Sequence, residues 1–181
     1  MATITLPTTG TWVLDPAHTT IGFTVKHLMA AKVRGSFKSF GGTIEVGDTP
    51  ASSSVSVSIE AASIDTGAVD RDNHLRSADF LKVEQFPTLT FTSTAVSDRG
   101  DGSHQVSGDL TIRDVTKSVT LDLAFGGLMN DPWGNSKAIF SATTKINRED
   151  WGLTWNAPLE AGGWLVGKEI TIEIEAQAAK S

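Results

Sequence analysis

The sequence contains no cysteine among its 181 residues, so it can form neither a disulfide nor a metal site with thiolate ligands. It also lacks any apolar run close to the ~18 residues that a transmembrane helix needs. Basic residues are outnumbered, with 15 Lys and Arg against 21 Asp and Glu, and none of them forms a run. Because phosphate recognition requires a basic face, the sequence argues against nucleic-acid binding.

The first twelve residues carry neither a basic n-region nor the apolar stretch of about 7 to 15 residues that a secretory signal peptide has. We therefore expect no signal peptide and a soluble, cytoplasmic protein. The length fits a single domain over residues 1–181. No nucleophile elbow, Walker loop, dinucleotide glycine fingerprint or metalloprotease helix is present, so no cofactor is predicted.

Alternation of apolar and polar residues is the main structural signal. In residues 21–26 and 170–175 every second residue is large and apolar, which is typical of a strand with one buried face. The pattern predicts strands near residues 12–14, 19–27, 33–46, 53–61, 88–96, 106–112, 119–125, 138–146 and 170–175.

Three segments interrupt this alternation. The inward parity changes near residues 40–42, which predicts a bulge or bend. Residues 65–84 predict two short helices behind the candidate N-caps Asp70 and Asp79. Asn147 is expected to cap a single helical turn, and Arg148 is expected to take part in that cap.

Eight long alternating strands with mostly short connections predict an all-β fold, an extended eight-stranded antiparallel lipocalin-like barrel with short helices between strands. A two-sheet sandwich is the alternative. Strands of about 10 to 14 residues favour the barrel, and a barrel of this size can hold one small ligand.

The inward face mixes large and small side chains. Gly35, Ser93, Ala95, Gly108, Ala138 and Ala142 share it with the bulky residues and would leave a lumen, unless large neighbours fill the gaps. We predict that the following residues line the lumen and contact a ligand: Ile21, Phe23, Val25, His27, Phe37, Val57, Ile59, Leu89, Phe91, Leu110, Leu121, Leu123, Phe140 and Ile172.

Few polar residues are candidates for chemistry. His27 has inward parity and could contact a ligand or end a strand, whereas His18 is expected to fix the turn beside Asp15. Arg71, His74 and Arg76 could hold a polar head group, or could pair with neighbouring charges on a solvated helix. A late group, Trp133, Trp151, Trp155 and Trp164, could plug the lumen or pack in the core.

Several motifs in order along nearly the whole chain are similar to those of the YceI-like family of lipocalin-like polyisoprenoid-binding proteins. They are W-x-L-D-P-x-H (12–18), F-x-V-K-H-L (23–28), V-x-G-x-F (33–37), T-G-x-x-x-R-D-x-H-L (66–75), S-A-D-F (77–80), F-P-T-L-T-F (86–91), G-D-L-T-I-R-D-V-T-K (108–117) and N-R-E-D-W-G-L (147–153).

The resemblance implies a barrel with a long apolar channel that takes a long-chain isoprenoid or fatty-acid-like ligand. We therefore expect a carrier or sequestering protein, with a homodimer as a candidate assembly. One alternative is an enzyme acting on an isoprenoid-type substrate with His27 or His74 as acid/base. Another is a stress or interaction protein that uses the outer face of the barrel.

Overall fold

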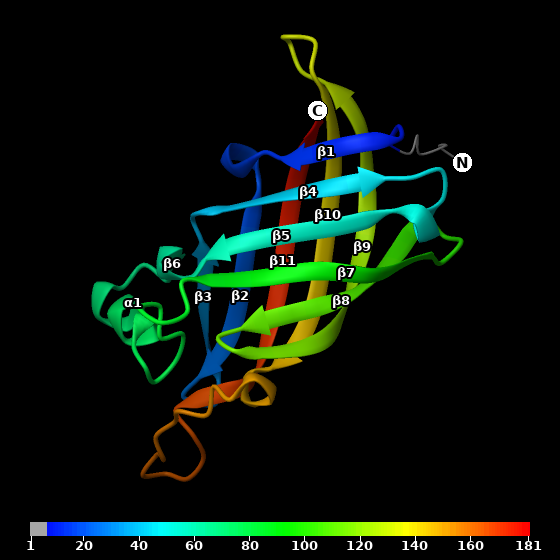
Figure 1. Cartoon of the computed structure of the whole chain (residues 1–181). Coiled ribbons are helices and arrows are strands. Elements are labelled where there is room, and N and C mark those ends of the chain that lie inside the picture. The colour runs from blue at the N-terminus through cyan, green and yellow to red at the C-terminus, as the bar shows by residue number, and fades with distance from the viewer. Residues whose placement is uncertain (1–6) are drawn as a thin grey trace.

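The computed structural model describes residues 7–181, so the part of the signal-peptide expectation that concerns residues 1–6 lies outside it. Within this range one antiparallel sheet has the order β1-β4-β5-β7-β8-β9-β10-β11-β2-β3-β6, and pairing of β1 with β11 closes it (Figure 1). The strands are β1 (Gly10–Leu14), β2 (Thr20–His27), β3 (Ala31–Phe37), β4 (Phe40–Val46), β5 (Ser54–Glu60), β6 (Ile64–Asp65), β7 (Thr88–Asp98), β8 (Ser103–Ile112), β9 (Val115–Asn130), β10 (Ser136–Asn147) and β11 (Val166–Lys180).

Four of these strands form two long, bent strands. β1 leads into β2 through the 3-10 helix η1 (Pro16–His18), and β3 leads into β4 across residues 38–39. β2 pairs with β3 and β1 pairs with β4, while β11 pairs with both β1 and β2. The result is a closed eight-stranded antiparallel barrel with few helices, which confirms the predicted fold class.

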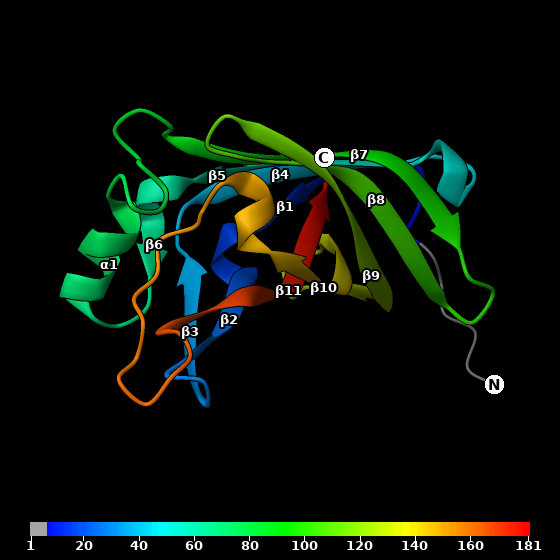
Figure 2. The same cartoon turned by 90° about the horizontal axis from the view of Figure 1, so that it is seen from below.

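The helical segments lie between strands. They are α1 (Val69–Arg76) and the 3-10 helices η2 (Pro50–Ser52), η3 (Ala61–Ser63) and η4 (Arg148–Trp151). Figure 2 shows α1 and β6 beyond one end of β5, to the side of the barrel. The predicted cap of η4 is confirmed, because the Asn147 side chain accepts a hydrogen bond from the Glu149 N–H.

Two details of the predicted elements are wrong. Residues 77–85 form turns rather than a second helix; Lys82 has a left-handed backbone with φ 47°, and the Asp79 carboxylate contacts the His74 ring. β9 does not end near residue 125, as the pattern predicts, but continues through Gly126 and Gly127 to Asn130. The two glycines do not interrupt the strand, because Gly127 adopts φ 120° within a bulge opposite Ile139 and Phe140.

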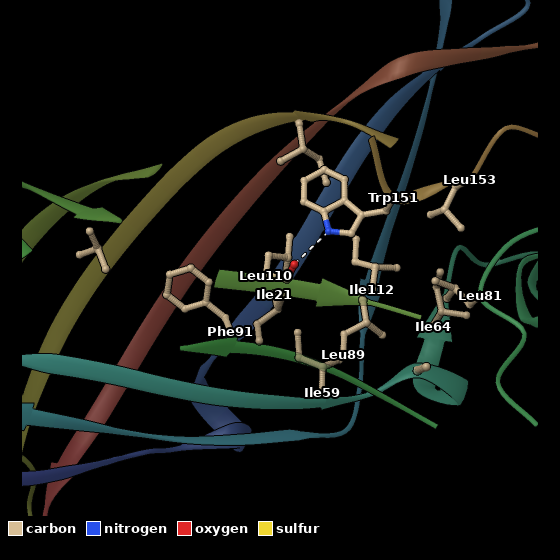
Figure 3. Packing of buried hydrophobic residues seen from close by; sticks show 13 residues of the cluster. Ile21, Ile59, Ile64, Leu81, Leu89, Phe91, Leu110, Ile112, Trp151 and Leu153 are labelled. Carbon is tan, nitrogen blue, oxygen red and sulfur yellow. Dashed lines mark hydrogen bonds between the residues drawn. The ribbon is translucent and has the colours of Figure 1, made fainter. Parts of the chain in front are cut away.

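The interior contains two packed groups of side chains. The first, shown in Figure 3, lies between β2, β5, β7, β8 and the end of β10, and the Trp151 indole N–H donates to the Leu110 carbonyl oxygen at 2.9 Å. The second surrounds Trp12, which is fully buried, together with Phe125 and Phe140. Removal of these apolar side chains from water stabilises the closed barrel.

Two inward glycines are covered by aromatic rings from neighbouring strands. The Phe23 ring lies over Gly35, and the Phe91 ring lies over Gly108. A Cβ at Gly108 would lie 2.5 Å from Phe91 Cζ and 2.6 Å from the Thr92 carbonyl oxygen. Both distances are shorter than a normal contact, and the Thr92 oxygen belongs to the backbone, which cannot move aside as a flexible side chain can. A side chain at Gly108 therefore does not fit.

We expect Gly108→Ala to lower the free energy of unfolding by about 1–3 kcal/mol, since overpacking forces the ring or strand to shift. Urea denaturation measures the change. Gly41→Ala is the matched control, because nothing lies within 4 Å of its Cβ position and it should be neutral or slightly stabilising. Equal stability of the two variants would contradict the close packing of Phe91.

The bend between β1 and β2 is fixed by Asp15. Its carboxylate accepts from the Ala17 N–H at 3.1 Å and contacts His18 Nδ1 at 2.8 Å and Lys137 Nζ at 3.2 Å. This confirms the predicted role of His18 at the turn. The hydrogen bond with His18 is the main reason that the pKa of Asp15 lies below its usual value; Lys137 adds to the effect and partial burial opposes it.

A lowered pKa in the folded state means that ionised Asp15 stabilises the protein at neutral pH. That contribution is present above the ordinary value of 3.8 and is lost as the pH falls through the folded-state pKa. We expect Asp15→Asn to cost less than about 1 kcal/mol at neutral pH, because the group is partly exposed. The free energies of unfolding of the two proteins, measured by denaturation at each pH, should become equal as the pH falls below 3.8. A difference that does not change with pH would contradict this assignment.

Candidate ligand-binding site

A cavity of ≈ 260 Å³ lies inside the barrel, surrounded by the inward faces of its strands. Its wall is almost wholly apolar; Thr19, Thr144 and Arg148 are the polar side chains in it. The apolar residues predicted to line the lumen all lie in this wall, and their contact with a ligand stays a prediction: Ile21, Phe23, Val25, Phe37, Val57, Ile59, Leu89, Phe91, Leu110, Leu121, Leu123, Phe140 and Ile172.

A second cavity of ≈ 470 Å³ adjoins the first. Five residues belong to both walls, namely Ile44, Val55, Val106, Leu123 and Phe140. The second cavity extends toward Pro7–Thr9 and the turn before β5, and it is more polar, because hydroxyl groups, Asp48 and His104 line it. The barrel therefore holds an apolar cavity and, beside it, a cavity with a mixed wall.

The small inward residues behave differently from one another. Ala142 lines the first cavity, whereas Gly35 and Gly108 lie under aromatic rings, as the alternative of paired large and small residues predicts. The prediction for Ala95 is wrong. A bulge between Ser93 and Ala95 shifts the register of β7, so that Ala95 is exposed and Val96 points inward.

Arg148 is a cation at the edge of the first cavity, with only 2% of its surface exposed. Nε donates to the Gly167 carbonyl oxygen at 2.9 Å, and Nη1 donates to those of Leu153 at 2.6 Å and Trp155 at 2.9 Å. Nη2 donates to the Val166 carbonyl oxygen at 3.3 Å. Burial lowers the pKa of Arg148, and the nearby charge of Glu149 partly offsets this.

The guanidinium group ties the segment after η4 to the start of β11 and so closes this end of the barrel. The expected role of Arg148 in the helix cap is wrong, since Asn147 provides the cap. A signal was present in the sequence: Arg148 continues by two residues the inward series that ends at Ile146.

His104 is the second polar residue that the sequence analysis missed. It lies at the start of β8, on the same face as Val106, and lines the second cavity with 9% of its surface exposed. Within residues 7–181 its ring makes no hydrogen bond, and Nδ1 is completely buried. The alternation that identified Val106 and Leu110 would also have placed His104 inward.

The other predicted polar contacts lie outside both cavity walls. His27 ends β2, where it pairs with Ala31 and Val166, so geometry does not support its predicted contact with a ligand. Arg71 donates to the Thr66 hydroxyl and carbonyl, and Arg76 donates to the Ala62 and Ile64 carbonyl oxygens.

The His74 ring is likewise occupied. Its Nε2 contacts Asp79 at 2.8 Å, and the ring packs edge-on against Trp155 with centroids 4.5 Å apart. Together with Arg71 and Arg76 it holds α1 in place, which agrees with the alternative that these charges find neighbouring partners. The tryptophans do not form one plug, because Trp151 is in the core while Trp133 is 83% exposed.

Within residues 7–181, no group of three or more His, Asp or Glu side chains is arranged to hold a metal ion. In the same range, no helix has the length and apolar character required to span a bilayer.

Comparison with known proteins gives one consistent family. The profile of the YceI-like domain matches residues 12–178. Protein YceI of Salmonella newport is 42% identical over 138 residues, which cover 76% of this chain and 72% of the relative. The crystal structure of the Campylobacter jejuni YCEI protein superposes with a TM-score of 0.73 and 32% identity, covering 100% of this chain and 99% of the other.

A more distant structure shares the fold. A domain from Saccharophagus degradans, described as a polyisoprenoid binding domain implicated in plant cell wall breakdown, superposes with a TM-score of 0.71 over 94% of this chain and 98% of its own length. At 13% identity, this likeness shows the fold alone.

Proposed function

Because the chain belongs to the YceI-like domain family, we propose that it binds a polyisoprenoid or a similar long-chain amphiphile inside the barrel, and so carries or sequesters it. The observation that carries this proposal is the apolar wall of the first cavity, built from inward side chains of nearly every strand. The description of the Saccharophagus degradans relative as polyisoprenoid-binding supports the same class of ligand.

The driving force would be the removal of apolar surface from water, about 25 cal/mol per Å². The first cavity alone, at ≈ 260 Å³, is at the small end for a ligand pocket. A long chain therefore needs both cavities and has to pass Leu123 and Phe140, which belong to both walls. This favours a slender, flexible ligand over a compact, rigid one.

The test is organic extraction of protein purified from its native host, followed by mass spectrometry of the extract. We expect a long-chain lipid in stoichiometric amount. In native mass spectrometry, the loaded and the extracted protein should differ by the mass of that lipid. A natively purified protein that carries no lipid, and that also fails to take up an isoprenoid alcohol after extraction, would contradict the proposal.

The enzymatic alternative gains no support from the arrangement of its candidate residues. His27 and His74 lie outside both cavity walls, where an acid/base group would have to meet an apolar substrate. We keep the cytoplasm as the proposed compartment, to be tested by cell fractionation. A homodimer remains a proposal that light scattering of the purified protein would test.

A further inference from the structure

The His104 ring is buried without any hydrogen-bonding partner in residues 7–181. Nδ1 has almost no accessible surface, and the residue is 9% exposed in the wall of the second cavity. A buried polar group left without a partner is costly, and folded proteins rarely keep one without a reason. Because Nδ1 has almost no accessible surface, a ligand can reach only Nε2, which is a donor or an acceptor depending on the tautomer and so suits a hydroxyl or amide group.

Two other polar side chains around this cavity already form hydrogen bonds. The Ser53 hydroxyl donates to the Thr49 carbonyl oxygen at 3.0 Å and accepts from the Gly47 N–H at 3.0 Å. The Thr8 hydroxyl accepts from Lys180 Nζ at 2.8 Å. Among the polar side chains of this wall, His104 is distinguished by being both nine-tenths buried and without a partner in residues 7–181, so we take it as the contact for a ligand.

The charge of the wall decides which polar group fits. Its described residues include the carboxylate of Asp48 and no Lys or Arg side chain. An anionic head group would be repelled by Asp48, and Lys180, a cation that contacts this wall, already donates its Nζ to the Thr8 hydroxyl at 2.8 Å. At the other end of the hollow, Arg148 has its guanidinium engaged by four carbonyl oxygens.

We propose that the ligand lies with its polar end in the second cavity, where an uncharged hydroxyl or amide group hydrogen-bonds to His104, and with its chain in the first cavity. The inference rests on the proposed function and extends it, because it assigns the direction of the ligand and the chemical class of its head group: neutral and hydrogen-bonding, rather than a phosphate or carboxylate.

Matched isoprenoids test this assignment. Extracted wild-type protein is loaded with the fluorescent probe N-phenyl-1-naphthylamine, which is then displaced by geranylgeraniol, by its methyl ether or by geranylgeranyl phosphate. We expect the alcohol to bind about tenfold more tightly than the ether, the gain of one satisfied buried hydrogen bond. The phosphate should bind more weakly than the alcohol, and Asp48→Asn should narrow that difference.

Variants of the ring identify the contact. His104→Leu should bind alcohol and ether equally, while His104→Gln, which keeps a donor and an acceptor, should retain part of the preference. His27→Leu is the matched control, because His27 lies outside both walls, and it should behave as wild type. In the absence of lipid, His104→Leu should melt at a temperature equal to or above that of wild type, since it removes an unpaired buried nitrogen.

The outcomes separate the two proposals. If wild type binds neither the fluorescent probe nor any isoprenoid, the proposed function fails. If it binds all three isoprenoids equally, or if His104→Leu keeps the preference for the alcohol, the lipid-binding function stands and the placement of the head group fails. A lower melting temperature of His104→Leu without lipid would also overturn the inference, since it would make the ring a structural residue.

Discussion

Replacing Arg148 with methionine should lower the free energy of unfolding by about 3–5 kcal/mol, the largest loss that we expect from a single substitution here. Methionine keeps much of the side-chain volume but removes the Arg148 donors from the carbonyl oxygens of Leu153, Trp155 and Gly167, while that of Val166 keeps its bond from Asn156 Nδ2. Each buried acceptor without a partner costs about 1–3 kcal/mol, and water entering the site recovers part of that. Chemical denaturation measures the change.

Lys168→Met is the matched control. Lys168 directly follows Gly167, whose carbonyl oxygen Arg148 binds. Its side chain is exposed and forms an ion pair with Glu149 at 3.3 Å. Such pairs contribute less than about 1 kcal/mol. Arg148→Lys should fall between the two, because an ammonium group cannot reach several diverging acceptors as the planar guanidinium does. If Arg148→Met is as stable as Lys168→Met, the proposed closure of this end of the barrel is wrong.

A carboxylate in the first cavity should abolish lipid binding. Leu121 lies in the wall of that cavity, so in Leu121→Asp an apolar chain could enter only by removing water from a charged group. We expect the affinity for geranylgeraniol to fall by a factor on the order of 100 or more. Fluorescence displacement measures the affinity, and circular dichroism reports whether the barrel is intact.

Two further variants separate a loss of binding from a loss of folding. Thr120→Asp places the same charge one residue away on the outer face of β9, where Thr120 is exposed, and should bind as wild type does. Ala142→Phe adds no charge but places a ring in the cavity wall, and it should reduce the capacity for lipid while the protein stays folded. Undiminished binding by a folded Leu121→Asp protein would refute the predicted lining.

The strands and the inward residues were predictable because their signal is local. Alternation with a period of two depends only on neighbouring residues, and it placed Ile21 and Phe140 in the cavity wall without any knowledge of the partner strands. The same pattern contained His104 and Arg148. His104 precedes the strand predicted at residues 106–112, and Arg148 lies in the segment predicted as a helix cap.

Bulges set the limit of that local reasoning. One extra residue at Ser93–Ala95 reverses the direction of the following side chains, and the pattern of small and polar residues in β7 does not locate it. The contacts of the polar head-group candidates show a related limit, and their role with a ligand stays a prediction. Arg71, His74 and Arg76 form a dense charged segment in sequence, but the partners that occupy them, among them Ile64 and Trp155, come from other parts of the chain.

The sequence by itself determined that this protein is an antiparallel barrel with a water-excluding inner face, because each strand carries its own pattern. Only the tertiary structure decided how much of the interior is empty: rings from adjacent strands fill the space beside Gly35 and Gly108, while the hollow along Ala142 stays open. It also decided that His104 lines the second cavity without a hydrogen-bonding partner in residues 7–181. Empty volume and unsatisfied hydrogen-bonding groups are properties of several strands together, and no single segment encodes them.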